Sequence, residues 1–133
     1  GNGVHGVHIE TSTGNVVGGT NAPEANLIAF NLADGVAVTG NSSTNNTLRG
    51  NRIFDNGGLG IDLGNNGVTA NDPLDSDIGP NGYQNYPVLT NAVKSNATMR
   101  VAGTLRSQPN RLYRLDFYAS PVADDSGHGE GQT

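Results

Sequence analysis

Short alternations of apolar and polar residues, each opened by a glycine, recur along the first half of the chain. The pattern glycine, aliphatic, any residue, aliphatic occurs at Gly6–Ile9, Gly35–Val38 and Gly60–Leu63. Alternation with a period of two is typical of a β-strand that buries one face. It predicts three stacked copies of one strand, with Val7, Ile9, Val36, Val38, Ile61 and Leu63 inside and His8, Ala37 and Asp62 outside.

A second pattern repeats at a fixed distance. The segment Asn26–Asn31 returns as Asn51–Asn56, a spacing of 25 residues (51 − 26), and Gly35 returns as Gly60 at the same spacing. A constant period of this length, with glycine and asparagine between short apolar strands, is typical of a solenoid. The sequence therefore predicts an all-β chain of about three coils of about 25 residues each.

Two further strands complete each predicted coil. Val17 matches Leu48, and Ile28 matches Ile53. The first coil is longer than the second, and the extra residues fall in Thr20–Ala25, a polar segment with a proline that we expect to protrude as a loop. The ends of such a stack expose unpaired strand edges, so we expect something to cover them or the chain to self-associate there.

Asparagine recurs at the predicted corners, as Asn26 with Asn51 and Asn31 with Asn56. Inward-facing amides would hydrogen-bond along the stack as a ladder and satisfy buried backbone groups. The alternative is that these amides face solvent and contact a ligand.

The motifs Gly35–Val38, Asn46–Ile53 and Gly60–Leu63, taken together, resemble the right-handed parallel β-helix repeat proteins of bacterial secreted and surface proteins. The resemblance covers roughly residues 1–90, and residues 101–133 resemble the β-rich module that often follows the repeats. It implies the C-terminal coils of a right-handed parallel β-helix, a secreted or cell-surface location and a structural or adhesive role. The same fold also hosts polysaccharide lyases and glycoside hydrolases.

The repeat breaks at residues 64–87, a long acidic loop inside the first predicted domain, residues 1–90. Its oxygen donors have spacings similar to those of calcium-binding loops. The candidate ligands are Asp72, Asp75, Asp77 and Asn81. The alternative is a solvated loop in which these side chains form local turns. Beside the loop, Tyr83 and Tyr86 are candidates for carbohydrate binding by stacking on sugar rings.

The second predicted domain, residues 91–133, is an antiparallel β cap or the start of a β-sandwich module. Alternation over Met99–Leu105 and Arg111–Phe117, with a turn at Ser107–Asn110, predicts a hairpin. Residues His128–Thr133 read as a glycine-flanked tail leading to a further strand.

The composition of the chain argues against several classes of partner and site. The net charge is −5 and the seven Lys and Arg residues are scattered, so a nucleic-acid partner is not expected. The chain has no cysteine, which excludes disulfides and thiolate metal sites. No apolar run reaches the ~20 residues of a membrane span, so we expect no membrane-spanning segment. We interpret the chain as part of a longer secreted protein.

The outward column His8, Ala37 and Asp62 contains no pair of carboxylates for acid–base catalysis. We therefore expect a non-catalytic structural or adhesive segment that binds glycans. The alternative is a fragment of a polysaccharide lyase or glycoside hydrolase acting on acidic polysaccharides.

Overall fold

The computed structural model describes residues 1–133 and consists mostly of strands, with almost no helix. The two helical segments are single 3-10 turns, η1 (Ala22–Glu24) and η2 (Pro80–Tyr83). The strands are β1 (Val7–Glu10), β2 (Val16–Gly18), β3 (Leu27–Ala29), β4 (Val36–Thr39), β5 (Thr47–Arg49), β6 (Arg52–Phe54), β7 (Ile61–Leu63), β8 (Val88–Ser95) and β9 (Thr98–Thr104). The all-β prediction is confirmed.

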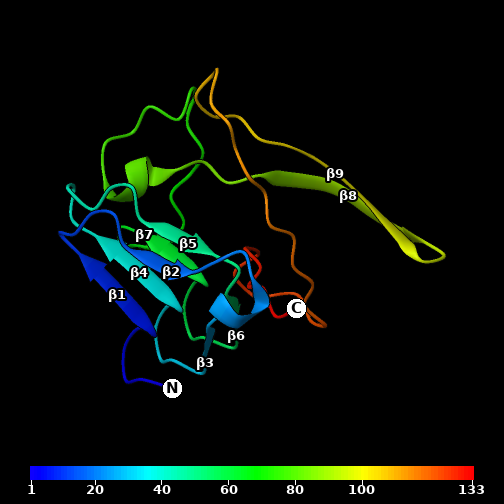
Figure 1. Cartoon of the computed structure of the whole chain (residues 1–133), viewed down its shortest axis with the longest axis horizontal. Helices are drawn as coiled ribbons and strands as arrows, with labels where there is room; N and C mark the ends of the chain where they lie inside the picture. The colour runs from blue at the N-terminus through cyan, green and yellow to red at the C-terminus, as the bar shows by residue number, and fades with distance from the viewer.

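The first seven strands form three parallel sheets, ordered β1-β4-β7, β2-β5 and β3-β6. The chain visits the three sheets in the same order twice. We call residues 7–29 the first circuit and residues 36–54 the second, and β7 begins a third. The predicted partners pair in register: Val7 with Val36, Val36 with Ile61, Val17 with Leu48 and Ile28 with Ile53. Figure 1 shows β1, β4 and β7 side by side.

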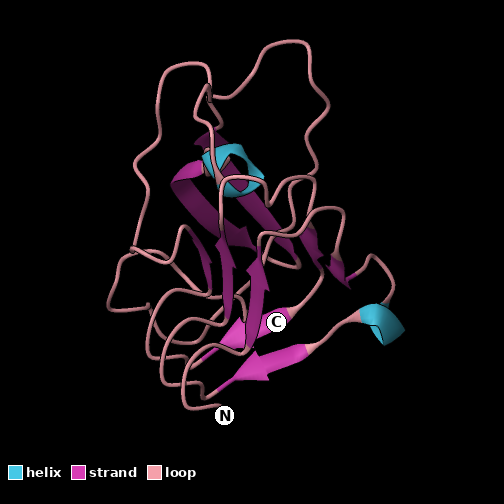
Figure 2. Ribbon diagram, turned by 90° about the vertical axis from the view of Figure 1, so that its left-hand side faces the viewer, coloured by secondary structure: helices cyan, strands magenta, loops and turns pink.

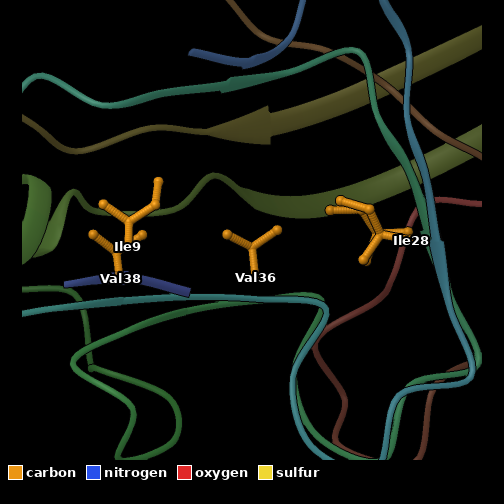
Figure 3. Close-up of a cluster of buried hydrophobic side chains, with 5 residues drawn as sticks. Ile9, Ile28, Val36 and Val38 are labelled. Atoms are coloured by element: carbon orange, nitrogen blue, oxygen red, sulfur yellow. The ribbon is translucent and has the colours of Figure 1, made fainter. Parts of the chain in front are cut away.

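The core lies between the three sheets. Its buried members are Ile9, Ile28, Val36, Val38 and Ile53, and Val7, Val17, Leu48 and Leu63 pack against them. Figure 3 shows Ile9 stacked on Val38. Each fully buried aliphatic side chain contributes about 1.5–3 kcal/mol relative to an exposed one. Strand alternation therefore places the core as predicted, although Ile61 in the last strand is 42% exposed.

The predicted asparagine ladders are present. The Oδ1 atom of Asn51 accepts the backbone N–H of Asn26 at 3.1 Å and its Nδ2 at 2.9 Å. Asn56 accepts the same two donors from Asn31 at 3.2 and 2.7 Å. These part-buried bonds satisfy backbone donors at the corners.

A further ladder, not predicted from the sequence, joins three circuits. Asn46 Oδ1 accepts the backbone N–H of Asn15 at 2.9 Å, and Asn81 Oδ1 accepts the backbone N–H of Asn46 at 2.9 Å. Asn81 lies in η2, so Pro80–Tyr83 continues the third circuit beside β5.

The inserted residues of the first circuit form an exposed loop, as predicted, and contain η1. Its first turn is held by Glu24, which accepts the Asn21 amide nitrogen at 2.8 Å and the Asn21 backbone N–H at 3.1 Å. These bonds lower the pKa of Glu24.

The predicted hairpin is wrong in its partners. Strand β9 pairs with β8, which precedes it, through a tight turn between Ser95 and Thr98, and Arg111–Phe117 is not a strand. Asn96 lies in the turn with a left-handed φ of 51°, a conformation that asparagine tolerates. Every residue of the two strands is exposed, and Figure 1 shows the ribbon projecting away from the parallel sheets. Figure 2 shows the long loops that surround the short strands.

The C-terminal residues lie against the second circuit, where β5 and β6 would otherwise end the stack. We call residues 116–133 the C-terminal cap. Arg49 forms an ion pair with Asp116, and Gly131 O accepts the backbone N–H of Ile53 at 2.8 Å. Figure 1 shows the C-terminus beside β6. This end of the stack is therefore partly covered by this segment and not by the hairpin.

Candidate functional site

The acidic loop, residues 64–87, is organised around one buried amide. The side chain of Asn85, 2% exposed, donates to the carbonyl oxygens of Asp72 and Arg106, each at 2.8 Å, and accepts the Asp72 backbone N–H at 3.1 Å. The loop is thereby tied both to itself and to the chain that follows β9.

Asp75 is held by protein donors on both carboxylate oxygens. Oδ1 accepts the Asn85 backbone N–H at 2.8 Å, and Oδ2 accepts the Ser107 hydroxyl. The Gln108 side chain also donates to the Asp75 carbonyl at 3.0 Å. Asp75 is 6% exposed, so its carboxylate serves to fasten the loop.

The other predicted ligands lie in different surroundings. Asp72 Oδ2 accepts the Ser76 backbone N–H and hydroxyl at 3.1 and 3.0 Å, whereas Asp72 Oδ1 is buried without a hydrogen-bond partner. Asp77 is exposed, and Asn81 is engaged by Asn46 in the ladder. No three Asp, Glu or His side chains come together in a geometry that could hold a metal ion.

The two predicted sugar-stacking residues differ in access. The Tyr83 ring packs against two glycines, since a Cβ placed on Gly79 would lie 2.0 Å from Tyr83 Cε2 and one on Gly64 3.0 Å from Cε1. Tyr86 is 36% exposed and meets His128 edge to face, with the ring centroids 5.1 Å apart. Of the two rings, that of Tyr86 therefore belongs to the more exposed residue, whereas Tyr83 is half-buried.

The outward column of the first sheet follows the predicted register, His8 to Ala37 to Asp62. Two of its members are covered: Ala37 is 0% exposed and Asp62 is 3% exposed. The carboxylate of Asp62 accepts the backbone N–H groups of Asn65 at 3.0 Å and Gly67 at 2.8 Å. Asp62 thus fixes the start of the acidic loop.

A buried histidine–aspartate pair was missed by the sequence reasoning. His5 Nδ1 lies 3.1 Å from Asp34 Oδ2, and both side chains are less than a tenth exposed. Asp34 Oδ1 also accepts the Leu59 backbone N–H at 2.7 Å. The spacing of 29 residues (34 − 5) equals that from Val7 to Val36, so the repeat offset contained the signal.

Close to this pair, His8 Nε2 lies 2.8 Å from the Thr39 hydroxyl, and the His5 and His8 rings are 5.4 Å apart. A hydroxyl within hydrogen-bond distance of an imidazole is one structural requirement of a nucleophilic catalytic site. The histidine that touches Thr39 is not the one oriented by Asp34, so the three-part arrangement of such sites is incomplete.

A cleft of about 820 Å³ separates the corner residues 54–67 from the C-terminal cap. Its ionisable side chains are all acidic: Asp34, Asp55, Asp62, Asp124, Asp125 and Glu130. Glu130 binds Asn56 Nδ2 at 2.8 Å, and Asp124 accepts the Ser126 backbone N–H at 2.8 Å. The Ser126 hydroxyl and N–H lower the pKa of Asp124. The cleft is therefore strongly negative at neutral pH.

No helix in the structure has both the length and the apolar character needed to cross a membrane. Comparison of the chain with protein-family models, with curated proteins and with solved structures found no match.

Proposed function

We propose that this chain is a rigid, non-catalytic segment of a right-handed parallel β-helix, part of a secreted or cell-surface protein in which it acts as a structural and adhesive element. The observation that carries the proposal is the in-register pairing of strands on three sides, joined at the corners by asparagine ladders. Such pairing runs hydrogen bonds along one axis, which suits a spacer that holds a surface at a fixed distance.

The contacts of the polar side chains support a structural role. Asp34, Asp62 and Asp75 are each at most 6% exposed, and each accepts at least one backbone N–H. A catalytic acid or base must instead reach the substrate proton that it transfers. These carboxylates stabilise loops.

The charge of the cleft also bears on the alternative, a lyase or hydrolase acting on acidic polysaccharides. An acidic polymer entering a cleft lined by six carboxylates would be repelled, because like charges in a recess raise each other's energy. Incubation with uronic-acid polymers is expected to release no reducing ends and no unsaturated products. Turnover of any such polymer would replace the structural proposal with the enzymatic one.

For the adhesive part of the proposal, we assign glycan stacking to Tyr86. Tyr86 is 36% exposed, its backbone N–H donates to Asn71 Oδ1 at 2.9 Å, and His128 packs against the ring edge to face. A ring fixed in this way loses little conformational entropy on binding.

Electrophoresis in gels containing neutral polysaccharides tests this assignment. Retardation is expected for the native chain and not for Tyr86→Ala, while Phe117→Ala, which removes an aromatic ring that is 60% exposed, is expected to be retarded as before. Equal mobility of the native chain with and without every polysaccharide would remove the adhesive role.

A calcium ion is a second candidate, and one atom favours it. Asp72 Oδ1 is a buried carboxylate oxygen without a hydrogen-bond partner, and carboxylate oxygen is a preferred ligand of calcium. Asp77, exposed in the same loop, is the other predicted ligand with free oxygens. Asp75 and Asn81 are already engaged by protein donors.

If calcium binds here, excess calcium raises the melting temperature above that in chelator, because a ligand that binds only the folded state stabilises it. Asp72→Asn is expected to abolish the increase, and Glu10→Gln, an exposed change on β1, is expected to keep it. An unchanged melting temperature in the native chain would exclude the ion.

A further inference from the structure

The acidic loop contains one peptide bond with unusual chemistry, the bond between Asp72 and Pro73. Of the six prolines in the chain, only Pro73 follows an aspartate. The nitrogen of this bond carries no hydrogen. As a tertiary amide nitrogen it takes up a proton, and leaves, more readily than an ordinary amide nitrogen when the carbonyl carbon is attacked. The aspartate side chain has the length to make that attack by closing a five-membered ring.

The Asp72 carboxylate has one oxygen held and one oxygen free. Oδ2 accepts the Ser76 backbone N–H at 3.1 Å and the Ser76 hydroxyl at 3.0 Å. Oδ1 is buried and has no hydrogen-bond partner. A buried carboxylate oxygen without a partner is unfavourable, and no donor engages its lone pairs. Oδ1 is therefore the oxygen available to act as a nucleophile.

The carbonyl group beside this oxygen is held by the buried amide of Asn85. Asn85 Nδ2 donates to the Asp72 carbonyl oxygen at 2.8 Å, and Asn85 Oδ1 accepts the Asp72 backbone N–H at 3.1 Å. Asn85 is itself fixed, since it is 2% exposed and its amide also donates to the Arg106 carbonyl at 2.8 Å. A fixed donor on a carbonyl oxygen stabilises the negative charge that develops there during attack, as in an oxyanion hole.

We propose that this loop cleaves its own chain between Asp72 and Pro73. Asp72 Oδ1 attacks the Asp72 carbonyl carbon, and a C–O bond forms. The C–N bond to Pro73 then breaks, and the proline nitrogen takes a proton from water, which reaches it because Pro73 is exposed. The products of this step are a cyclic anhydride at Asp72 and a free amino terminus at Pro73.

A water molecule then hydrolyses the anhydride and leaves two carboxyl groups on Asp72. The solvent regains its proton when these groups ionise, so the net change is the hydrolysis of one peptide bond by one water, and no oxidant or reductant is required. The Ser76 donors keep their acceptor throughout, since Oδ2 is a carbonyl oxygen in the anhydride. Forming the anhydride also removes the unpaired charge from Oδ1.

Cleavage divides the chain into residues 1–72, with the parallel strands, and residues 73–133, with the hairpin and the C-terminal cap. The two pieces remain bound, because Asn81 Nδ2 donates to the Asn46 carbonyl at 2.8 Å and Ile53 N–H donates to the Gly131 carbonyl at 2.8 Å. The inference does not depend on glycan binding. The calcium candidate uses the same Asp72 oxygen, so the test is made in chelator.

The full chain is incubated with chelator at neutral and at mildly acidic pH, and samples are denatured and analysed by mass spectrometry. We expect two fragments, residues 1–72 and 73–133, whose masses sum to that of the chain plus one water. Their rate of formation is expected to be first-order and independent of protein concentration, because the attack is intramolecular. Absence of these fragments, or a rate constant that rises with protein concentration, would overturn the proposal.

The same incubation in urea measures what the fold contributes. The folded chain is expected to cleave at least about tenfold faster than the unfolded chain, because only the fold places the Asn85 donor on the carbonyl and leaves Oδ1 unpaired. Equal or faster cleavage in urea would reveal the ordinary lability of an Asp-Pro bond and would contradict the proposal.

Two substitutions at the bond itself test the nucleophile and the leaving group. Asp72→Ala is expected to abolish cleavage. Pro73→Ala, which replaces the tertiary amide nitrogen by a poorer leaving group, is expected to slow it at least about tenfold. Pro109→Ala, at another exposed proline, is the control and is expected to cleave as the native chain does. An unchanged rate in either variant at the bond would overturn the proposal.

Asn85→Asp tests the donor, because it keeps an oxygen for the Asp72 N–H and removes the amide that binds the carbonyl. The folded variant is expected to cleave no faster than the native chain in urea. Circular dichroism establishes whether the variant folds, and the comparison with urea decides the question if it does not. A folded Asn85→Asp that cleaves at the native rate would contradict the proposal.

Discussion

At the scale of single residues, Asn51 forms hydrogen bonds between circuits that a buried aliphatic side chain cannot form. It is 4% exposed, accepts the Asn26 backbone N–H and side-chain amide, and donates its own amide to the Val17 carbonyl at 2.8 Å. One side chain thus satisfies backbone groups on both sides of the corner between β2 and β3.

Replacing Asn51 with alanine is expected to lower the free energy of unfolding by about 2 kcal/mol, because it leaves a part-buried N–H and a part-buried carbonyl unpaired, at about 1 kcal/mol each. Urea unfolding followed by circular dichroism measures the change. Asn66→Ala, at an exposed residue without a side-chain hydrogen bond, is the control. A loss for Asn51→Ala no larger than for the control would mean that the ladders do not hold the corners.

Glycine is required at Gly35 for a different reason. A Cβ there would lie 2.4 Å from Ile53 Cγ2 and 2.6 Å from the Gly60 carbonyl oxygen, and a Cβ on Gly6 would lie 2.7 Å from the Gly35 carbonyl. The column of glycines at the start of each stacked strand thus reflects how closely successive circuits approach.

Gly35→Ala is therefore expected to cost about 1–3 kcal/mol, the usual range for overpacking, and to lower the melting temperature. Gly3→Ala, where nothing lies within 4 Å of the added Cβ, is expected to leave it unchanged. Equal melting temperatures for the two variants would show that the circuits do not approach as the structure has them.

At this scale the repeat offset made much of the site predictable, and its failures have physical causes. The spacing of 25 residues found Asn26, Asn51 and their partners. It did not find Asn81, because the irregular residues 64–79 precede that residue and destroy the period. Glu130 was missed because this carboxylate, one circuit beyond Asn56 in space but 74 residues later in sequence, takes the place of the next asparagine.

At the scale of elements, the C-terminal cap shows how a segment without regular strands covers a sheet edge. Arg49 donates from Nε to Asp116 Oδ2 at 3.0 Å, Arg52 donates to the Gln132 carbonyl at 2.8 Å, and the Tyr118 ring packs over Gly131. Burial raises the pKa of Tyr118. Each contact joins the cap to the second circuit.

The ion pair gives the cap a pH dependence of known sign. The hydrogen bonds and charge of Arg49 lower the pKa of Asp116, so the folded state binds fewer protons than the unfolded state. The stabilisation is therefore full above the ordinary aspartate pKa of about 3.9 and is lost as the pH falls through the lowered value. Because the pair lies at the surface, the effect is small.

Native protein is accordingly expected to be slightly more stable than Asp116→Asn at pH 7, and the difference is expected to vanish in strong acid. Urea midpoints of the two proteins across this pH range measure it. Added salt, which screens surface charges, should shrink the difference at neutral pH. A difference that grows on acidification would contradict the assigned ion pair.

The hairpin shows where element prediction from sequence fails. The first predicted domain ends at residue 90, inside the strand Val88–Ser95, and the alternating segment Arg111–Phe117 offered a plausible but incorrect partner. The short turn at Asn96 decided the pairing, because local closure costs less entropy than a longer loop. The strands of the repeats were predictable, since the same pattern of apolar and polar residues occurs in each copy of the repeat.

At the scale of the whole molecule, the stack of circuits has two different ends. The C-terminal cap pairs with β6 of the second circuit, whereas β1, β2 and β3 of the first circuit have a strand on one side only. The few hydrophobic residues of this polar chain are enough to form its core, because the core is only a narrow column of aliphatic side chains between three sheets. The hairpin, exposed throughout, lies outside this column.

The central claim is that the repeats stack directly upon one another, and nuclear Overhauser effects between methyl groups test it most directly. With strands about 4.8 Å apart, cross-peaks are expected from Val7 to Val36, from Val36 to Ile61 and from Ile28 to Ile53. Cross-peaks that instead join methyl groups only to close sequence neighbours, with none across 25 or 29 residues, would contradict the account.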